Sequence, residues 1–325
     1  MKSSRTALRA LACGACLCGA LLVSQSAWAK PPAVALNVTA PVAVRAKAAF
    51  TMKGTASAGV SAGERLTVSV ERLGKDWSVV STSAITVGTA HQFSKKLSEA
   101  ARGHWRIEVS VPATLTHDAA TGTAEFKVFG SKVIALTFDD GPWPKSTQSI
   151  VSELSNNYVE ATFFEIGSQI PGRASLSKLI LANDNIIGVH SWNHDLMTTR
   201  SNRTNANDLQ RCKNALKDAT GYDARWFRPP YGATNARLKA TAKSVGLQQV
   251  LWTVDTLDWK YRVKASIVSR ALAGAKDGGV ILMHDGGGPR SATVAAVPTI
   301  IAKLRAKGFD FATLDQMAAL GYKIR

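Results

Sequence analysis

The stretch ALTFDDGPWP, residues 135–144, joins an apolar run typical of a buried strand to two adjacent carboxylates and a Gly-Pro break. Asp139 and Asp140 repel each other, so their adjacency at a strand end needs a chemical reason. A polar turn without chemistry would explain these ten residues alone. The alternative is a metal ligand beside a general base. In that case we expect the turn at Gly141-Pro142 to bring both carboxylates to one rim, although neighbours in a strand point opposite ways.

From Ser131 onward the sequence alternates between strand-like and helix-like segments. The candidate strands are residues 132–138, 161–166, 186–190, 225–228, 248–254, 279–284 and 309–312, and amphipathic helical patterns lie between them. Seven such units in about 195 residues predict a parallel α/β fold, either a barrel or a doubly wound sheet. In a barrel, reactive side chains lie at the carboxyl ends of the strands.

Titratable or cationic residues follow five of the seven candidate strands. They are Asp139 and Asp140, His190, Arg228, Asp255 and Asp258, and His284. The histidines of this half of the chain, His190, His194 and His284, all belong to these segments. Since the carboxyl ends of parallel strands meet at one edge, the pattern predicts a single site.

The segment HSWNH places His190 and His194 four residues apart. If this segment makes a helical turn, both imidazoles share one face and can bind one metal ion. The spacing alone is a weak signal. With Asp140 it becomes a set of two imidazoles and one carboxylate, which is common at catalytic zinc sites. Asp139 is then a candidate general base.

The remaining polar strand ends complete a catalytic hypothesis. Arg228 is expected to orient Asp139, or else to form a structural ion pair. The N–H of Tyr231, which follows two prolines, is a candidate oxyanion donor. His284 is a candidate general acid whose imidazolium Asp258 would stabilise, although a strand-end histidine is often only hydrogen-bonded.

Six aromatic residues cluster near these segments and suit either sugar stacking or core packing. We expect Trp226 and Trp252, inside apolar strands, to lie in the core. Trp259, just beyond a strand end, is expected to contact substrate.

Five ordered segments, TFDDGP, HSWNH, RPPYG, DTLDW and ILMHD, resemble the motifs of the polysaccharide deacetylase domain, also called the NodB-homology domain of carbohydrate esterase family 4. The resemblance covers about Ser131 to Tyr322. It implies a distorted (β/α)7 barrel and metal-dependent removal of acetyl groups from sugars.

The resemblance also implies roles for individual residues. By motif, Asp139 resembles the base, Asp140, His190 and His194 the metal ligands, Arg228 the arginine that orients the base, Tyr231 the oxyanion donor, Asp258 the partner of the acid, His284 the acid, and Leu282 the residue that cups the acetyl methyl group. Many relatives have proline after the second motif histidine, where this chain has Asp195, so the loop and the adjoining substrate subsite differ.

The amino terminus has the pattern of a secretory signal peptide, with a basic start, an apolar run over residues 10–23 and the small-residue site Ala27-Trp28-Ala29. We expect cleavage after Ala29 and a secreted protein, periplasmic or extracellular. The alternative is a membrane anchor, for which the run is short. No later segment is long and apolar enough to span a membrane. Three of the four cysteines lie in this leader, so Cys212 cannot form an intrachain disulfide after cleavage.

Residues 30–130 read as all-β, with about seven short alternating runs that predict an immunoglobulin- or fibronectin-like sandwich. This region could bind sugar or act as a spacer. The formal net charge is +17, or about +14 without the leader. This charge could attract the protein to acidic surfaces such as cell-wall polymers, or it could simply keep the protein soluble. No cluster of basic residues interleaved with aromatics indicates nucleic-acid binding.

These observations predict a signal peptide at 1–29, a β-sandwich at 30–130 and a deacetylase barrel at 131–325. We expect hydrolysis of acetyl groups from N-acetylated sugars of a chitin, peptidoglycan or poly-N-acetylglucosamine type of polymer. Zn²⁺ is the expected ion, with Co²⁺ or another divalent ion as alternatives. The rival functions are an O-acetyl esterase acting on xylan through the same site and a non-enzymatic glycan-binding protein.

Overall fold

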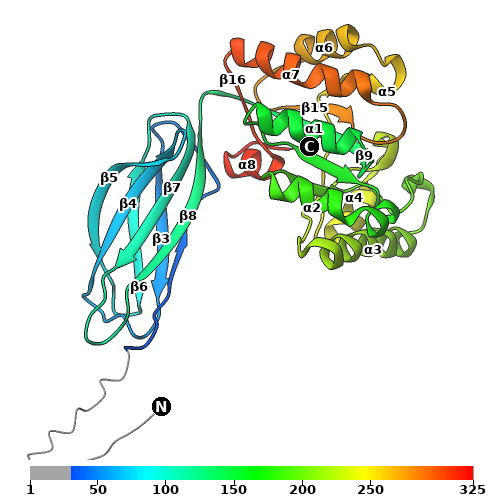
Figure 1. Ribbon diagram of the computed structural model, residues 1–325. Coiled ribbons are helices and arrows are strands. Elements are labelled where there is room, and N and C mark those ends of the chain that lie inside the picture. Colours follow the sequence, from blue (N-terminus) through cyan, green and yellow to red (C-terminus); the bar gives the residue numbers. More distant parts are fainter. Residues whose placement is uncertain (1–30, 325) are drawn as a thin grey trace, which may run out of the picture.

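The computed structural model describes residues 31–324, which form an all-β region followed by an α/β region (Figure 1). The predicted signal peptide, residues 1–29, lies outside the described residues. The predicted fold class, a barrel-like α/β region preceded by an all-β region, is confirmed.

The all-β region is a sandwich of two sheets. Its strands are β1 (Leu36–Thr39), β2 (Ala43–Arg45), β3 (Ala49–Ala56), β4 (Arg65–Leu73), β5 (Trp77–Thr86), β6 (Gln92–Ser98), β7 (Gly103–Val111) and β8 (Ala120–Phe129). One sheet has the order β1-β3-β6 and the other β2-β8-β7-β4-β5. The alternating apolar residues of both sheets, such as Met52, Val68 and Ile107, are fully buried between them.

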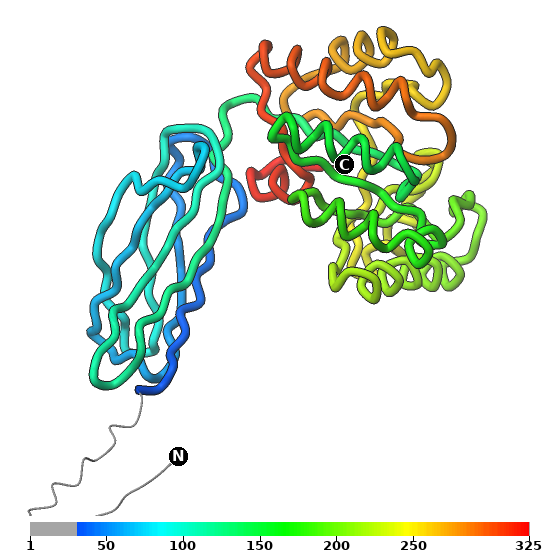
Figure 2. Tube along the Cα trace, viewed as in Figure 1, coloured from blue at the N-terminus to red at the C-terminus, as the bar shows by residue number. Residues whose placement is uncertain are grey.

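The α/β region alternates strands and helices along the chain (Figure 2). Its strands are β9 (Lys132–Gly141), β10 (Thr162–Glu165), β11 (Ile186–Val189), β12 (Trp226–Phe227), β13 (Gln248–Gln249), β14 (Val254–Asp255), β15 (Gly279–His284) and β16 (Phe309–Phe311). Its helices are α1 (Ser146–Asn156), α2 (Ala174–Ala182), α3 (Asn202–Thr220), α4 (Ala236–Ser244), α5 (Asp258–Tyr261), α6 (Lys264–Ala273), α7 (Ser291–Ala306) and α8 (Leu314–Ala319).

The strands of the α/β region pair in parallel in the order β13-β12-β11-β10-β9-β15-β14, and β16 also pairs with β9. The predicted strand 248–254 is instead two short strands. Its beginning pairs with β12 and its end with β15, so this segment crosses between the two edges of the sheet. β9 is buried along almost its whole length, which explains its unbroken apolar run.

Helices α1, α2, α3, α4, α6 and α7 cover the sheet, because each contributes buried apolar side chains to its core. The longest, α3, begins where the side chain of Ser201 accepts a hydrogen bond from the N–H of Thr204, and it ends at Gly221 with φ 77°. Cys212 is a free thiol buried within this helix. Within residues 31–324, none of the helices has the length and hydropathy needed to cross a bilayer.

The all-β region contacts the end of the α/β region where the parallel strands begin. Lys127 forms an ion pair with Glu160, which precedes β10. The N–H of Gly130 donates to Asp310 Oδ2 over 2.6 Å, at β16. Because reactive residues of such folds lie where the strands end, the sandwich is at the opposite end from the expected site.

The buried ring pair Phe138–Phe163, whose centroids are 5.1 Å apart, lies at the centre of this sheet. We expect Phe163→Ala to lower the free energy of unfolding by about 3 to 5 kcal/mol, because it leaves a cavity that the sheet cannot close. Urea unfolding followed by helical circular dichroism measures this change. The exposed Val263 is the control, and Val263→Ala should cost less than about 0.5 kcal/mol. Equal losses in both variants would contradict this description of the core.

Candidate active site

A β-bulge places the two adjacent carboxylates in one site. In the pairing of β9 with β10, Asp139 lies opposite Phe164 and Gly141 lies opposite Glu165, which leaves Asp140 unpaired. Asp140 has a left-handed backbone with φ 74°. The expected turn therefore begins at Asp140 itself, one residue before Gly141-Pro142. Gly141 is required because a β-carbon there would lie 2.3 Å from Asp285 Oδ2.

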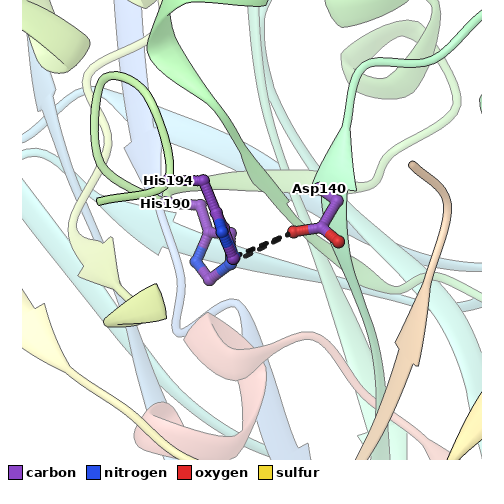
Figure 3. A group of neighbouring side chains, drawn as sticks. All are labelled: Asp140, His190 and His194. Carbon is purple, nitrogen blue, oxygen red and sulfur yellow. Dashed lines mark ion pairs between the residues drawn. The ribbon is translucent and has the colours of Figure 1, made fainter. Parts of the chain in front are cut away.

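Asp140, His190 and His194 bring their ligand atoms together (Figure 3). Asp140 Oδ1 lies 3.4 Å from Nε2 of His190 and 3.4 Å from Nε2 of His194. Ligand atoms on a tetrahedral ion with bonds of about 2.1 Å lie about 3.4 Å apart, so the spacing fits a Zn²⁺-sized ion. Asp140 Oδ1 is buried and has no hydrogen-bond partner among the described residues, and a bound cation would compensate this oxygen by coordination.

The state of the two imidazoles also suits metal binding. Nδ1 of His190 lies 2.7 Å from the carbonyl oxygen of Arg228, which fixes the proton on Nδ1 and leaves Nε2 as the ligand atom. Burial and the neighbouring His190 lower the pKa of His194. Burial opposes the charge of Asp140, but the interactions with His190, together with the charges of His284 and His194, outweigh it and lower the pKa of Asp140 well below its usual value.

The segment HSWNH does not make the helical turn that would place both imidazoles on one face. Ser191 and His194 both have left-handed backbones, with φ 62° and 64°. The side-chain oxygen of Ser191 accepts the N–H of His194 over 2.9 Å, in place of a helical backbone bond. The rings still meet, with centroids 5.0 Å apart, because the loop folds back on itself.

Arg228 and Asp139 form a buried charge pair beside these ligands. Nη1 of Arg228 donates to Asp139 Oδ1 over 2.8 Å and to the hydroxyl of Thr137 over 2.8 Å. The free oxygen, Asp139 Oδ2, lies 3.9 Å from Nε2 of His190. Arg228 therefore fixes one oxygen of Asp139 and leaves the other directed toward the ligand cluster.

His284 and Asp258 form a second buried pair on the other side of Asp139. His284 pairs in register with Asp139, and its Nδ1 lies 2.7 Å from Asp258 Oδ1. Asp258 Oδ2 accepts the N–H of His284 over 2.9 Å and the hydroxyl of Thr293 over 2.7 Å. Burial alone would lower the pKa of His284, but the hydrogen bond and charge of Asp258 outweigh it and raise that pKa.

The other candidate residues lie around this centre. Tyr231 has φ 62° in the turn Pro230–Gly232, and its ring meets that of His194 edge-on at 4.6 Å. Leu282 lies two residues before His284 on β15, and therefore on the same side of the sheet. Trp259 follows Asp258 and is 47% exposed, whereas Trp226 is buried as expected and Trp252 is partly buried against the core.

Sequence reasoning missed Thr137 and Thr293, which support the two charge pairs. Thr137 could have been found, since it is a polar residue two positions before Asp139 in an apolar strand. Thr293 has no comparable signal, because its contact with Asp258 spans 35 residues. Asp255 accepts the N–H of Leu257 and stabilises the turn before α5.

Comparison with known proteins agrees with this arrangement. The family model described as polysaccharide deacetylase matches residues 127–250. The chain is 40% identical over 187 residues to the peptidoglycan-N-acetylglucosamine deacetylase PgdA of Listeria monocytogenes, a match covering 58% of this chain and 39% of that protein's length. It is 37% identical over 200 residues to a peptidoglycan-N-acetylglucosamine deacetylase of Bacillus cereus, covering 59% of this chain and 90% of that relative.

Solved structures extend the comparison to the fold. The structure of peptidoglycan deacetylase PdaC from Bacillus subtilis matches with a TM-score of 0.54 and 36% identity, over 57% of this chain and 90% of that one. The Xyl-CE4 domain of a multidomain xylanase from the hindgut metagenome of Trinervitermes trinervoides matches with a TM-score of 0.54 and 33% identity, over 57% of this chain and 89% of that one. The chain thus belongs to the polysaccharide deacetylase family, carbohydrate esterase family 4, through its α/β region.

Proposed function

We propose that this protein hydrolyses the acetamido groups of N-acetylated sugars in a peptidoglycan-type polysaccharide. The proposal rests on one observation: three groups of side chains lie together at one end of the sheet. They are the ligand cluster Asp140, His190 and His194, the pair Asp139–Arg228 and the pair His284–Asp258. The names of the Listeria and Bacillus relatives support a peptidoglycan substrate.

Asp140, His190 and His194 would hold a divalent ion, for which we propose Zn²⁺. When bound, such an ion supplies Lewis acidity and lowers the pKa of a water molecule to about 7. The donor set, two imidazole nitrogens and one carboxylate oxygen, leaves a position open for water and substrate. Co²⁺ or another divalent ion could bind the same atoms.

The residues of the chain divide the proton transfers between them. Asp139, held at Oδ1 by Arg228, accepts a proton at Oδ2 from the attacking water. The N–H of Tyr231 donates to the developing oxyanion of the acetyl group. His284, whose Nδ1 is held by Asp258, donates a proton from Nε2 to the departing amine nitrogen.

The side chains at the rim suit a sugar chain. Tyr231 and Trp259 are 68% and 47% exposed and can contact sugar faces. Leu282 is 3% exposed and would pack against the acetyl methyl group. We further propose that the protein acts outside the inner membrane, in the periplasm or extracellularly, because the leader resembles a signal peptide. The sandwich, at the far end of the α/β region, would serve as a spacer or a second contact with the polymer.

An O-acetyl esterase acting on xylan is the second candidate, favoured by the match to a xylanase-associated domain. Mass spectrometry of products, after incubation of the metal-loaded protein with peptidoglycan, chitin oligomers and acetylated xylan, separates the two. We expect acetate from the N-acetylated substrates, and its loss after treatment with EDTA. Release from xylan alone would favour the esterase. Glycan binding that survives EDTA, without any acetate, would indicate a binding protein and contradict both enzymes.

The division between ligand and base can be tested with two variants. We expect Asp139→Asn to lower kcat by about 10² to 10⁴-fold while leaving Zn²⁺ affinity nearly unchanged, because the base is not a ligand. His194→Ala should abolish turnover and also weaken Zn²⁺ binding, because it removes a ligand. Steady-state kinetics and competition with a chromophoric chelator measure both quantities. Full activity in either variant would contradict the role assigned to that residue.

The pair Asp258–His284 predicts a shift in the pH profile. His284 must be protonated to act as an acid, so kcat/KM should fall as the pH rises through its pKa. Asp258 raises the pKa of His284, and Asp258→Asn should therefore move the alkaline limb to lower pH, by about 1 to 3 units. Initial rates measured across the pH range give the limb directly. An unmoved or upward-shifted limb would exclude His284 as the acid held by Asp258.

A further inference from the structure

The segment GGGPR, residues 286–290, follows the fifth motif and packs against a metal ligand. A β-carbon on Gly286 would lie 1.9 Å from the carbonyl oxygen of Asp140, and one on Gly287 would lie 2.5 Å from Asp140 Oδ2. Gly287 also has φ +71°. Glycine is therefore required here by close approach to Asp140 as well as by backbone conformation.

Arg290, the last residue of this segment, folds back over the glycines. Its side chain is buried, and its Nε donates to the carbonyl oxygen of Gly286 over 2.6 Å. Its Nη2 lies 3.2 Å from the position that a β-carbon on Gly287 would take. Arg290 Nη2 and Asp140 Oδ2 therefore border the same small space, which exists because residue 287 has no side chain.

The charge of Arg290 is not neutralised by an ion pair of the ordinary kind. Among the described residues, no carboxylate forms an ion pair with its guanidinium within 4.0 Å, and the buried Nη1 has no hydrogen-bond partner. A buried cation is costly unless negative charge compensates it. Arg228, the other buried arginine at this site, is paired with Asp139 over 2.8 Å. Asp140 is the carboxylate that Nη2 of Arg290 approaches across Gly287.

We propose that Arg290, acting across Gly287, is a positioning residue that holds the outer oxygen of Asp140 and so keeps Oδ1 directed at the metal. The contact runs through one bridging water, because Arg290 Nη2 and Asp140 Oδ2 border the same space but lie more than 4.0 Å apart. Holding Oδ2 prevents the carboxylate from rotating, so Oδ1 stays 3.4 Å from both imidazole nitrogens. The inference rests on the proposed metal site.

Two variants address the two sides of this contact. Arg290→Gln removes the cation, and Gly287→Ala leaves Arg290 in place but puts a methyl group in the space between its Nη2 and Asp140 Oδ2, 2.5 Å from that oxygen. The matched control is Arg305→Gln. Arg290 precedes the first turn of α7, whereas Arg305 lies in its last turn and donates to the carbonyl oxygens of Asn157 and Tyr158. Zn²⁺ dissociation constants from chelator competition, the visible spectrum of the Co²⁺-loaded protein and the thermal midpoint of the metal-free protein are the readouts.

We expect Arg290→Gln and Gly287→Ala each to weaken Zn²⁺ binding by about 10 to 100-fold and to change the Co²⁺ spectrum, as loss of a residue that orients a ligand does. Arg305→Gln should leave both unchanged. The thermal midpoints of the metal-free variants show whether a loss of Zn²⁺ affinity arises from unfolding of the protein. Gly287→Ala tests the contact even if Arg290→Gln does not fold.

Zn²⁺ binding by Arg290→Gln that equals or exceeds that of the parent would overturn the proposal. Removing a cation without disturbing Asp140 should strengthen the attraction for Zn²⁺. Parent-like binding by Gly287→Ala would also overturn it. These measurements use no substrate, so failure here is distinct from failure of the proposed function. That function would instead fail if the parent released no acetate from any glycan.

Discussion

The left-handed conformation of Asp140 is the constraint on which the site depends. In a regular strand Asp139 and Asp140 would point to opposite sides of the sheet. The bulge between β9 and β10 leaves Asp140 unpaired, so both carboxylates can reach the same cluster. The cost of this backbone is compensated by neighbours that fit only this shape, with Gly141 beside Asp285 and Gly286 and Gly287 against Asp140.

The two carboxylates that are adjacent in sequence have different partners. Arg228 occupies one oxygen of Asp139 and is itself buried, so the pair is held in a fixed geometry. Asp140 faces two imidazoles and keeps a buried oxygen without a hydrogen-bond partner among the described residues. Asp139 is therefore oriented as the proposed base requires, and Asp140 is left for the proposed cation. The pair His284–Asp258 lies on the neighbouring strand, where it can act on a different atom of the substrate.

The sequence predicted much of this site because parallel strands collect their carboxyl ends at one edge. The strands that carry the site have apolar patterns that can be recognised in the sequence. The residues at their carboxyl ends are Asp139, His190, Arg228 and His284. The loop 190–194 does not form the helical turn that the spacing of its histidines allows, because the Ser191 hydroxyl takes the place of a backbone acceptor, and spacing does not reveal this. Strand β6, with Lys95 and Lys96, has too few apolar residues for its alternation to stand out. Arg290 and Thr293 act through contacts that only the folded chain brings together.

X-ray absorption spectroscopy of the Zn²⁺-loaded protein, at one ion per chain, tests whether Asp140, His190 and His194 together bind one divalent ion. We expect a first shell with two imidazole nitrogens and at least one carboxylate oxygen at about 2.0 to 2.2 Å. The imidazole signal should fall by half in a variant lacking His190 or His194. A first shell without imidazole, or one unchanged by loss of either histidine, would contradict the account.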